Sequence, residues 1–232
     1  MVYVKICGIT NLEDARCAAE AGADFLGVIF YPPSPRYIAP EQAGEITQAI
    51  RTEFRDASPR FVGVFVDEPI NAVRATIETA GLDLVQLHGT ETPADIAALA
   101  PYAFKALRPQ TLTEAQEAME NYLAAISFPP RSTVARGFAP RLPSTPDLII
   151  DAYHPQQKGG TGLVADVAIA RWFAERCRLL LAGGLTPENV ADAITQVRPW
   201  GVDVSSGVEA AKGKKDHTKV KAFIEATKRE TY

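Results

Sequence analysis

Short apolar segments alternate with amphipathic segments along the whole chain. The apolar segments are rich in Val, Ile, Leu and Phe and fall at Val2–Ile6, Phe25–Phe30, Phe61–Val66, Leu84–Leu87, Phe104–Leu107, Leu148–Ile150, Leu179–Ala182 and Val202–Val204. They are continuous rather than alternating, which is typical of strands buried on both faces of a parallel sheet. The pattern predicts parallel strands, each followed by a helix.

The amphipathic segments carry helix-start signals. A capping box is expected at Thr10–Glu13, with Thr10 as the cap, and Thr113 with Gln116 is expected to open a helix over 114–126. The pairs Thr92-Pro93 and Thr186-Pro187 each place a cap residue before Pro at the first helical position. Asp216 is expected to open the final helix toward Lys228.

The number of these units predicts the fold. Eight strand-helix units in 232 residues, with no change of composition between the halves, indicate one closed (β/α)8 barrel over residues 1–232. The rival is a doubly wound open sheet, but no G-x-G-x-x-G follows the first strand.

A proline-rich segment interrupts the regular order. Pro129–Pro146 contains five prolines and no periodicity, and it lies between the fifth helix and the sixth strand. In a barrel this connection belongs to the bottom face, opposite the chemistry. We therefore expect a surface excursion without a catalytic role, the alternative being contact with a partner.

Composition and charge narrow the class of protein. The chain is 47% hydrophobic, and its 24 basic and 28 acidic residues give a net charge of −4. This mild acidity argues against a broad nucleic-acid surface but allows a local anion site. The three scattered cysteines have no metal-ligand spacing, and no membrane span or signal segment is evident. We expect a cytoplasmic protein without metal, with its oligomeric state undetermined.

In a barrel enzyme the chemistry lies at the carboxyl ends of the strands and in the loops that follow. The residues at those positions that could carry chemistry are Cys7, Arg36, His88, Asp151, Gly160 in the turn 159–162, Gly183, Gly184, Asp203, Ser205, Ser206 and Gly207.

The last two strands are followed by candidate phosphate-binding turns. Gly183-Gly184 follows the seventh strand and Ser205-Ser206-Gly207 the eighth, where loops of this fold frequently bind phosphate through backbone amides. We assign Gly160, in the turn after the sixth strand, to the same site. The alternative is that these are only tight turns.

Four side chains at the expected mouth carry further chemistry. Cys7 could act as a base or nucleophile if its pKa is lowered, the alternative being a small buried hydrophobe. Asp151 follows three buried aliphatic residues, so desolvation could keep it protonated as a general acid, the alternative being a structural salt bridge. The planar fork of Arg36 suits a carboxylate, and His88 could orient substrate or bond to a neighbouring loop.

These residues stand in motifs that resemble one enzyme family. The motifs are Lys5-Ile6-Cys7-Gly8-Ile9-Thr10, Ser34-Pro35-Arg36-Tyr37, Gly63-Val64-Phe65, Val85-Gln86-Leu87-His88-Gly89, Gly159-Gly160-Thr161-Gly162, Ala182-Gly183-Gly184-Leu185-Thr186-Pro187-Glu188-Asn189 and Val202-Asp203-Val204-Ser205-Ser206-Gly207-Val208-Glu209. Together they resemble the phosphoribosylanthranilate isomerases of tryptophan biosynthesis, in order and from end to end. One departure is Leu163–Val167, where the family usually has Lys and then an aromatic-Asp-Trp group.

The resemblance implies an Amadori rearrangement of a phosphoribosyl substrate without a cofactor. It implies that Cys7 is the general base and Asp151 the general acid. It further implies that Arg36 holds the anthranilate carboxylate and that Asp203 meets a ribose hydroxyl or its neighbourhood.

Three other functions are weighed against this one. A histidine-branch phosphoribosyl-imidazole isomerase, or a bifunctional relative, performs the same rearrangement, but that family has aspartate where this chain has Cys7. A Schiff-base aldolase using Lys5 is weaker, because Lys5 should point outward or lie one layer below Cys7. A silent phosphosugar-binding barrel would need neither Cys7 nor Asp151.

Overall fold

The computed structural model describes residues 2–127, 145–151 and 163–230. In these residues eight parallel strands form a closed barrel, each pairing with its neighbours in chain order and β1 pairing with β8. The strands are β1 (Tyr3–Cys7), β2 (Phe25–Ile29), β3 (Arg60–Phe65), β4 (Leu84–Leu87), β5 (Ala103–Leu107), β6 (Leu148–Asp151), β7 (Leu179–Ala182) and β8 (Gly201–Val204). The predicted (β/α)8 barrel is confirmed.

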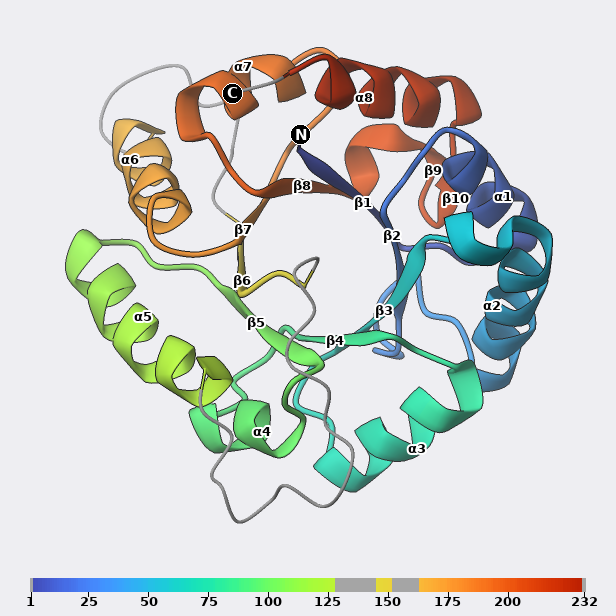
Figure 1. Ribbon diagram of the computed structural model, residues 1–232, viewed down its shortest axis with the longest axis horizontal. Coiled ribbons are helices and arrows are strands. Elements are labelled where there is room, and N and C mark those ends of the chain that lie inside the picture. Colours follow the sequence, from blue (N-terminus) through green and yellow to red (C-terminus); the bar gives the residue numbers. More distant parts are fainter. Residues whose placement is uncertain (1, 128–144, 152–162, 231–232) are drawn as a thin grey trace.

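An outer ring of helices covers the barrel, as Figure 1 shows. The helices are α1 (Leu12–Glu20), α2 (Pro40–Phe54), α3 (Ile70–Ala80), α4 (Pro93–Ala98), α5 (Leu112–Ser127), α6 (Leu163–Ala174), α7 (Val190–Val197) and α8 (His217–Arg229). A 3-10 turn, η1 (Arg55–Ala57), follows α2. Between β8 and α8 lie a second 3-10 turn, η3 (Ser206–Val208), and a small antiparallel pair, β9 (Glu209–Ala211) and β10 (Lys214–Lys215). None of the helices described here is long and apolar enough to cross a membrane.

The strand ends bear directly on the site. The predicted bounds of β4 and β7 are confirmed, and the other strands differ by one residue at one or both ends. Two of these differences matter, because β1 continues to Cys7 and β6 to Asp151. Both side chains are therefore fixed by strand pairing at the carboxyl end of the barrel.

Two of the expected helix starts are confirmed. The side chain of Thr92 accepts a hydrogen bond from the Asp95 amide, and Asp95 in turn accepts from the Thr92 amide, so that a complete capping box opens α4. Asp216 caps α8 by accepting from the amides of Thr218 and Lys219.

The expected capping box at Thr10 is wrong. Asn11 caps α1, because its side-chain oxygen accepts a hydrogen bond from the Asp14 amide at 2.8 Å. Thr10 Oγ1 instead donates to the carbonyl of Gly213 at 2.6 Å. A contact with a distant segment thus decides which of two adjacent cap-forming residues is used.

Two further helix starts are displaced from their expected positions. The helix α5 begins at Leu112, and Thr111, not Thr113, accepts a hydrogen bond from the Glu114 amide, at 3.2 Å. The helix α7 begins only at Val190, after a turn that contains Pro187. In that turn the Asn189 side chain accepts from the Thr186 amide at 2.8 Å, and Asn189, not Thr186, occupies the N-cap position of α7.

Most of the proline-rich segment lies outside the described residues. Its last two residues, Thr145 and Pro146, are described and are buried just before β6. The expected surface excursion is therefore wrong for these two residues.

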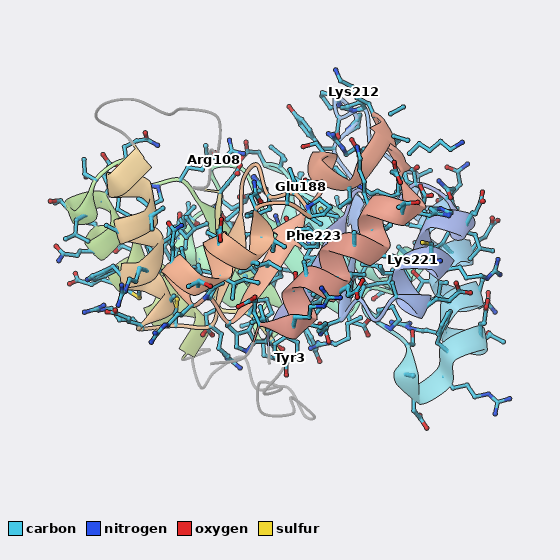
Figure 2. All side chains as sticks on the ribbon, turned by 90° about the horizontal axis from the view of Figure 1, so that it is seen from above. Tyr3, Arg108, Glu188, Lys212, Lys221 and Phe223 are labelled. Carbon is cyan, nitrogen blue, oxygen red and sulfur yellow. The ribbon has the colours of Figure 1, made fainter. Side chains whose placement is uncertain are left out.

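The barrel interior changes from apolar to polar along its axis. At the amino end of the strands the rings of Tyr3 and Trp200 stack with centroids 4.2 Å apart, and Phe25 packs beside them. Figure 2 shows Tyr3 at the end of the molecule opposite Arg108. Above this aromatic floor the interior holds an apolar cluster that includes Phe104 and Leu180, and a separate, larger apolar layer fills the space between sheet and helices.

Candidate active site

A cavity of about 300 Å³ opens at the carboxyl end of the barrel. Among its lining residues are ten of the predicted site residues: Cys7, Arg36, His88, Asp151, Gly183, Gly184, Asp203, Ser205, Ser206 and Gly207. The eleventh, Gly160, lies outside the described residues. Topology thus brings together residues as far apart in the chain as Cys7 and Gly207.

Cys7 ends β1 and is only 6% exposed. Burial raises the pKa of its thiol above the usual value, although Lys5 beside it acts in the opposite direction. The lowered pKa on which its reactivity was expected to depend is therefore not found. A thiolate at this position must therefore be stabilised by the positive charges that surround it.

Asp151 ends β6 and is joined to Arg108, whose Nη2 lies 2.8 Å from a carboxylate oxygen. Its side chain is 28% exposed, so the strong desolvation expected for it is not found. Arg108 follows β5 and also lines the cavity. Sequence reasoning missed Arg108, because an arginine next to proline in a polar loop carries no pattern of its own.

His88 lies directly after β4 and takes part in two hydrogen bonds. Its Nδ1 lies 2.8 Å from the side-chain amide of Gln86, and its Nε2 lies 3.0 Å from Nη2 of Arg108. Burial lowers the pKa of His88, and the neighbouring Arg108 lowers it further, so the ring is neutral at pH 7. His88 therefore joins the Asp151–Arg108 pair to β4.

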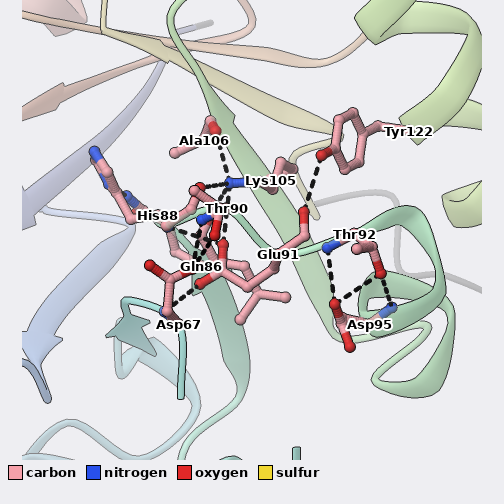
Figure 3. Close-up of polar contacts among 12 residues, drawn as sticks. Asp67, Gln86, His88, Thr90, Glu91, Thr92, Asp95, Lys105, Ala106 and Tyr122 are labelled. Atoms are coloured by element: carbon pink, nitrogen blue, oxygen red, sulfur yellow. Dashed lines mark hydrogen bonds and ion pairs between the residues drawn. The ribbon is translucent and has the colours of Figure 1, made fainter. Parts of the chain in front are cut away.

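A buried lysine holds the loop that carries His88 (Figure 3). Lys105 Nζ donates to the carbonyls of Leu87 and Gly89, at 3.2 and 2.7 Å, and pairs with Glu91 at 3.1 Å. Glu91 also accepts from the amides of Gly89 and Asp67, at 2.8 and 2.9 Å. These contacts fix the start of the loop without using any group of His88 itself.

Arg36, in the loop after β2, already binds a carboxylate of the chain itself. Its Nε and Nη2 each lie 2.7 Å from an oxygen of Glu209, and this hydrogen bonding raises the pKa of the guanidinium. Because Arg has five N–H donors, the donors on Nη1 remain for a further acceptor. Glu209 is also shared with Lys215, at 3.3 Å. Sequence reasoning assigned no role to Glu209 or Lys215.

The two glycine turns come together as expected. Gly183 and Gly184 have φ of +98° and +62°, a backbone region that favours glycine. Gly207 lies so close to the other turn that a Cβ added to it would be 1.8 Å from the carbonyl oxygen of Leu185. Ser205 lines the cavity, and its Oγ is buried and has no hydrogen-bond partner within the described part of the chain.

A buried ion pair lies beneath these groups. Lys5 is fully buried, and its Nζ lies 2.7 Å from an oxygen of Asp203, which is itself 8% exposed. Lys5 therefore occupies the layer below Cys7, one of the two positions expected for it. Within the described ranges no cluster of three or more His, Cys, Asp or Glu side chains could hold a metal ion.

Comparisons with known proteins point to one enzyme family. Residues 4–226 match the family model described as N-(5'phosphoribosyl)anthranilate (PRA) isomerase. The chain is 42% identical to N-(5'-phosphoribosyl)anthranilate isomerases of Pelobacter propionicus and Geobacter metallireducens, over 98% of this chain and 96% and 100% of theirs.

Solved structures agree with these sequence matches. The crystal structure of phosphoribosyl anthranilate isomerase from Thermotoga maritima superposes with a TM-score of 0.78 at 39% identity, covering 99% of this chain and all of that one. A structure of the isomerase in complex with reduced 1-(o-carboxyphenylamino)-1-deoxyribulose 5-phosphate gives a TM-score of 0.77 at 36% identity, with the same coverage.

Proposed function

Because the chain belongs to the N-(5'-phosphoribosyl)anthranilate isomerase family, we propose that Cys7 is the general base and Asp151 the general acid of its reaction. The protein is an isomerase of tryptophan biosynthesis. It converts N-(5-phosphoribosyl)anthranilate into 1-(2-carboxyphenylamino)-1-deoxyribulose 5-phosphate by an Amadori rearrangement.

The observation that carries this assignment is the order of groups around the mouth. Going through neighbouring strands from β6 to β1, the cavity presents Asp151, the turn at Gly183-Gly184, the turn at Ser205–Gly207, and Cys7. A phosphate held by the two central turns would leave the ribose between the carboxyl group and the thiol. Acid and base then reach the same sugar from two sides.

The reaction requires two proton transfers at such a sugar. A proton delivered to the ring oxygen opens the furanose and leaves a Schiff base at C1, the step we assign to Asp151. Removal of the C2 proton then gives the enolamine, the step we assign to Cys7. A positioned acid and base contribute typically 10²–10⁴-fold each to such transfers.

The remaining groups bind the two ends of the substrate. Backbone amides of the two glycine turns and the free hydroxyl of Ser205 are suited to the phosphate. Arg36, with the donors left by Glu209, is suited to the anthranilate carboxylate. Asp203 and His88 line the cavity between these ends and are assigned to substrate positioning.

Single truncations of the two proposed catalytic residues test the assignment. Cys7→Ala and Asp151→Ala should each lower kcat by roughly 10²–10⁴, measured by the loss of substrate fluorescence. The affinity for product should change little, because neither group is needed to hold the phosphate. Parental kcat in either variant would remove that residue from the mechanism.

We also infer a cytoplasmic location from the reaction itself. Substrate and product are both phosphorylated and carry a carboxylate, so neither crosses a lipid bilayer readily. Cell fractionation with activity measured in each fraction tests this inference.

A further inference from the structure

Lys5 is a buried charge that the reaction scheme above does not use. Its side chain has no exposed surface, and its register on β1 places it opposite Asp203 of β8, with which it forms the 2.7 Å ion pair. Buried ion pairs are weak contributors to stability, since the desolvation of both charges offsets much of their attraction. A stabilising role alone therefore does not account for this pair.

The thiol of Cys7 is the other polar group that lies beside Lys5 in the barrel. The two residues are two positions apart on β1, so their side chains point to the same face of the strand, into the barrel. Cys7 Sγ and Lys5 Nζ both border the space beside Gly27, at 2.8 and 3.0 Å from the place of an added Cβ, so the two groups lie close together. Lys5 thus pairs with Asp203 and lies beside the proposed general base.

Gly27 of β2 provides the space in which this contact is made. Gly27 is paired with Cys7 in the sheet, and a Cβ added to it would lie 2.8 Å from Cys7 Sγ and 3.0 Å from Lys5 Nζ. Any side chain here would occupy the volume that both atoms border. The absence of a side chain at position 27 therefore permits the thiol and the ammonium group to approach.

Lys5 remains charged in this position. Burial acts to lower its pKa, but the Asp203 carboxylate and Cys7 raise it by more, so the net shift is upward. Lys5 is therefore protonated at neutral pH, and its positive charge lies beside Cys7.

The other charged groups near Cys7 are already paired with a different carboxylate. Lys215, on β10, donates to the Cys7 carbonyl at 2.6 Å and pairs with Glu209. Arg36 pairs with both oxygens of the same Glu209. Among these cations of the described structure, Lys5 is the one whose charge acts most strongly against the effect of burial on the pKa of the Cys7 thiol.

We propose that Lys5 is a positioning residue of the isomerase reaction, whose ammonium group, anchored by Asp203, orients Cys7 and compensates the negative charge of its thiolate. This inference rests on the proposed role of Cys7 as general base. In the step concerned, the C2–H bond of the protonated Schiff base breaks and its electron pair forms the C1=C2 bond of the enolamine, while the C1=N π pair moves onto nitrogen and the proton passes to Sγ. Lys5 keeps its own protons throughout.

The test compares variants that differ only at Lys5. Lys5→Met alone would leave Asp203 as an uncompensated buried charge, so Lys5→Met is made in an Asp203→Asn background and compared with Asp203→Asn alone. The readouts are the pH dependence of kcat and the pH dependence of iodoacetamide labelling at Cys7, mapped by mass spectrometry to separate it from Cys17 and Cys177.

We expect loss of Lys5 to displace both pH profiles toward alkaline pH by at least about one unit, a tenfold loss of thiolate at a given pH. Product affinity should stay within about twofold of that of the Asp203→Asn variant. Gly27→Ala, which separates Sγ from Nζ without changing any charge, should displace the labelling profile in the same direction. It is also a second test should the double variant fail to fold.

Two results would overturn the inference, and they are distinguishable. If the labelling and kcat profiles of the double variant coincide with those of Asp203→Asn while Cys7→Ala is inactive, Lys5 is structural and the proposed function stands. If Cys7→Ala retains parental kcat, the proposed role of Cys7 is wrong and this inference falls with it.

Discussion

Gly207→Ala should damage the phosphate site through a single methyl group. The added Cβ would lie 1.8 Å from the carbonyl oxygen of Leu185 and 2.9 Å from its carbonyl carbon, and contacts below 3.0 Å essentially never occur for a real Cβ. Both opposing atoms belong to the backbone and cannot rotate away. The two turns must therefore move apart by more than about 1 Å.

The structure sets the size of the two effects. Forcing a methyl group into a packed contact costs about 1–3 kcal/mol of stability, and each kcal/mol lowers Tm by roughly 2–4 °C in a chain of this length. Separation of the turns should also lose at least one charge-assisted hydrogen bond to the phosphate, worth about 1.5–3 kcal/mol. Phosphate and product should therefore bind roughly 10–150-fold more weakly.

The assay is the dissociation constant of the product, measured by titration calorimetry, together with competition by inorganic phosphate at fixed ionic strength. The matched control is Gly22→Ala, because Gly22 has φ +93° and no atom within 4 Å of an added Cβ. That variant should lose stability by about 1 kcal/mol through backbone strain alone, with unchanged product affinity. Parental product affinity in Gly207→Ala would refute the placement of the phosphate at these turns.

Three further predictions follow from the same geometry. Arg36→Ala should raise KM strongly, whereas Arg36→Lys should restore only part of the loss, because a lysine cannot hold both oxygens of Glu209 and also donate to the substrate carboxylate; unchanged KM in Arg36→Ala would exclude the role. Millimolar phosphate or sulfate should compete with substrate in the parent enzyme, and an unchanged KM at constant ionic strength would contradict this. The His88 ring should be neutral at pH 7 with its proton on Nδ1, because Arg108 can only donate to Nε2; nitrogen NMR showing Nε2 protonated would be the contrary result.

The His88 prediction also bears on Gln86. The Oε1 atom of Gln86 is buried and has no hydrogen-bond partner in the described residues, while its Nε2 lies 2.8 Å from His88 Nδ1. A proton on Nδ1 needs an acceptor at that place. Rotating the side-chain amide by 180° would put Oε1 there, where it would accept the hydrogen bond from Nδ1.

Much of the barrel and its mouth could be predicted because both follow from local patterns and topology. Apolar runs define the strands, and the order of strands in a barrel then brings Cys7, Asp151 and the two glycine turns to one end. None of these steps requires knowledge of a particular side-chain contact.

The helix cap and the site residues that were not predicted from the sequence depend on contacts between distant segments. Thr10 and Asn11 are both competent caps, and the hydrogen bond from Thr10 to Gly213 decides between them. Arg108 and Glu209 lie in irregular or very short elements, so no periodicity marks them. Their roles arise only where Arg108 meets Asp151 and Glu209 meets Arg36.

The stacked rings of Tyr3 and Trp200 close the barrel at the end away from the site. The chamber is therefore a dead-end well rather than a tunnel, and substrate and product must pass the same opening in opposite directions. The next substrate molecule cannot enter from the other end and displace the product. Product must therefore leave the well before the next substrate binds. Handing the product to a following enzyme through the barrel axis is ruled out by this architecture, and any such transfer has to take place across the mouth.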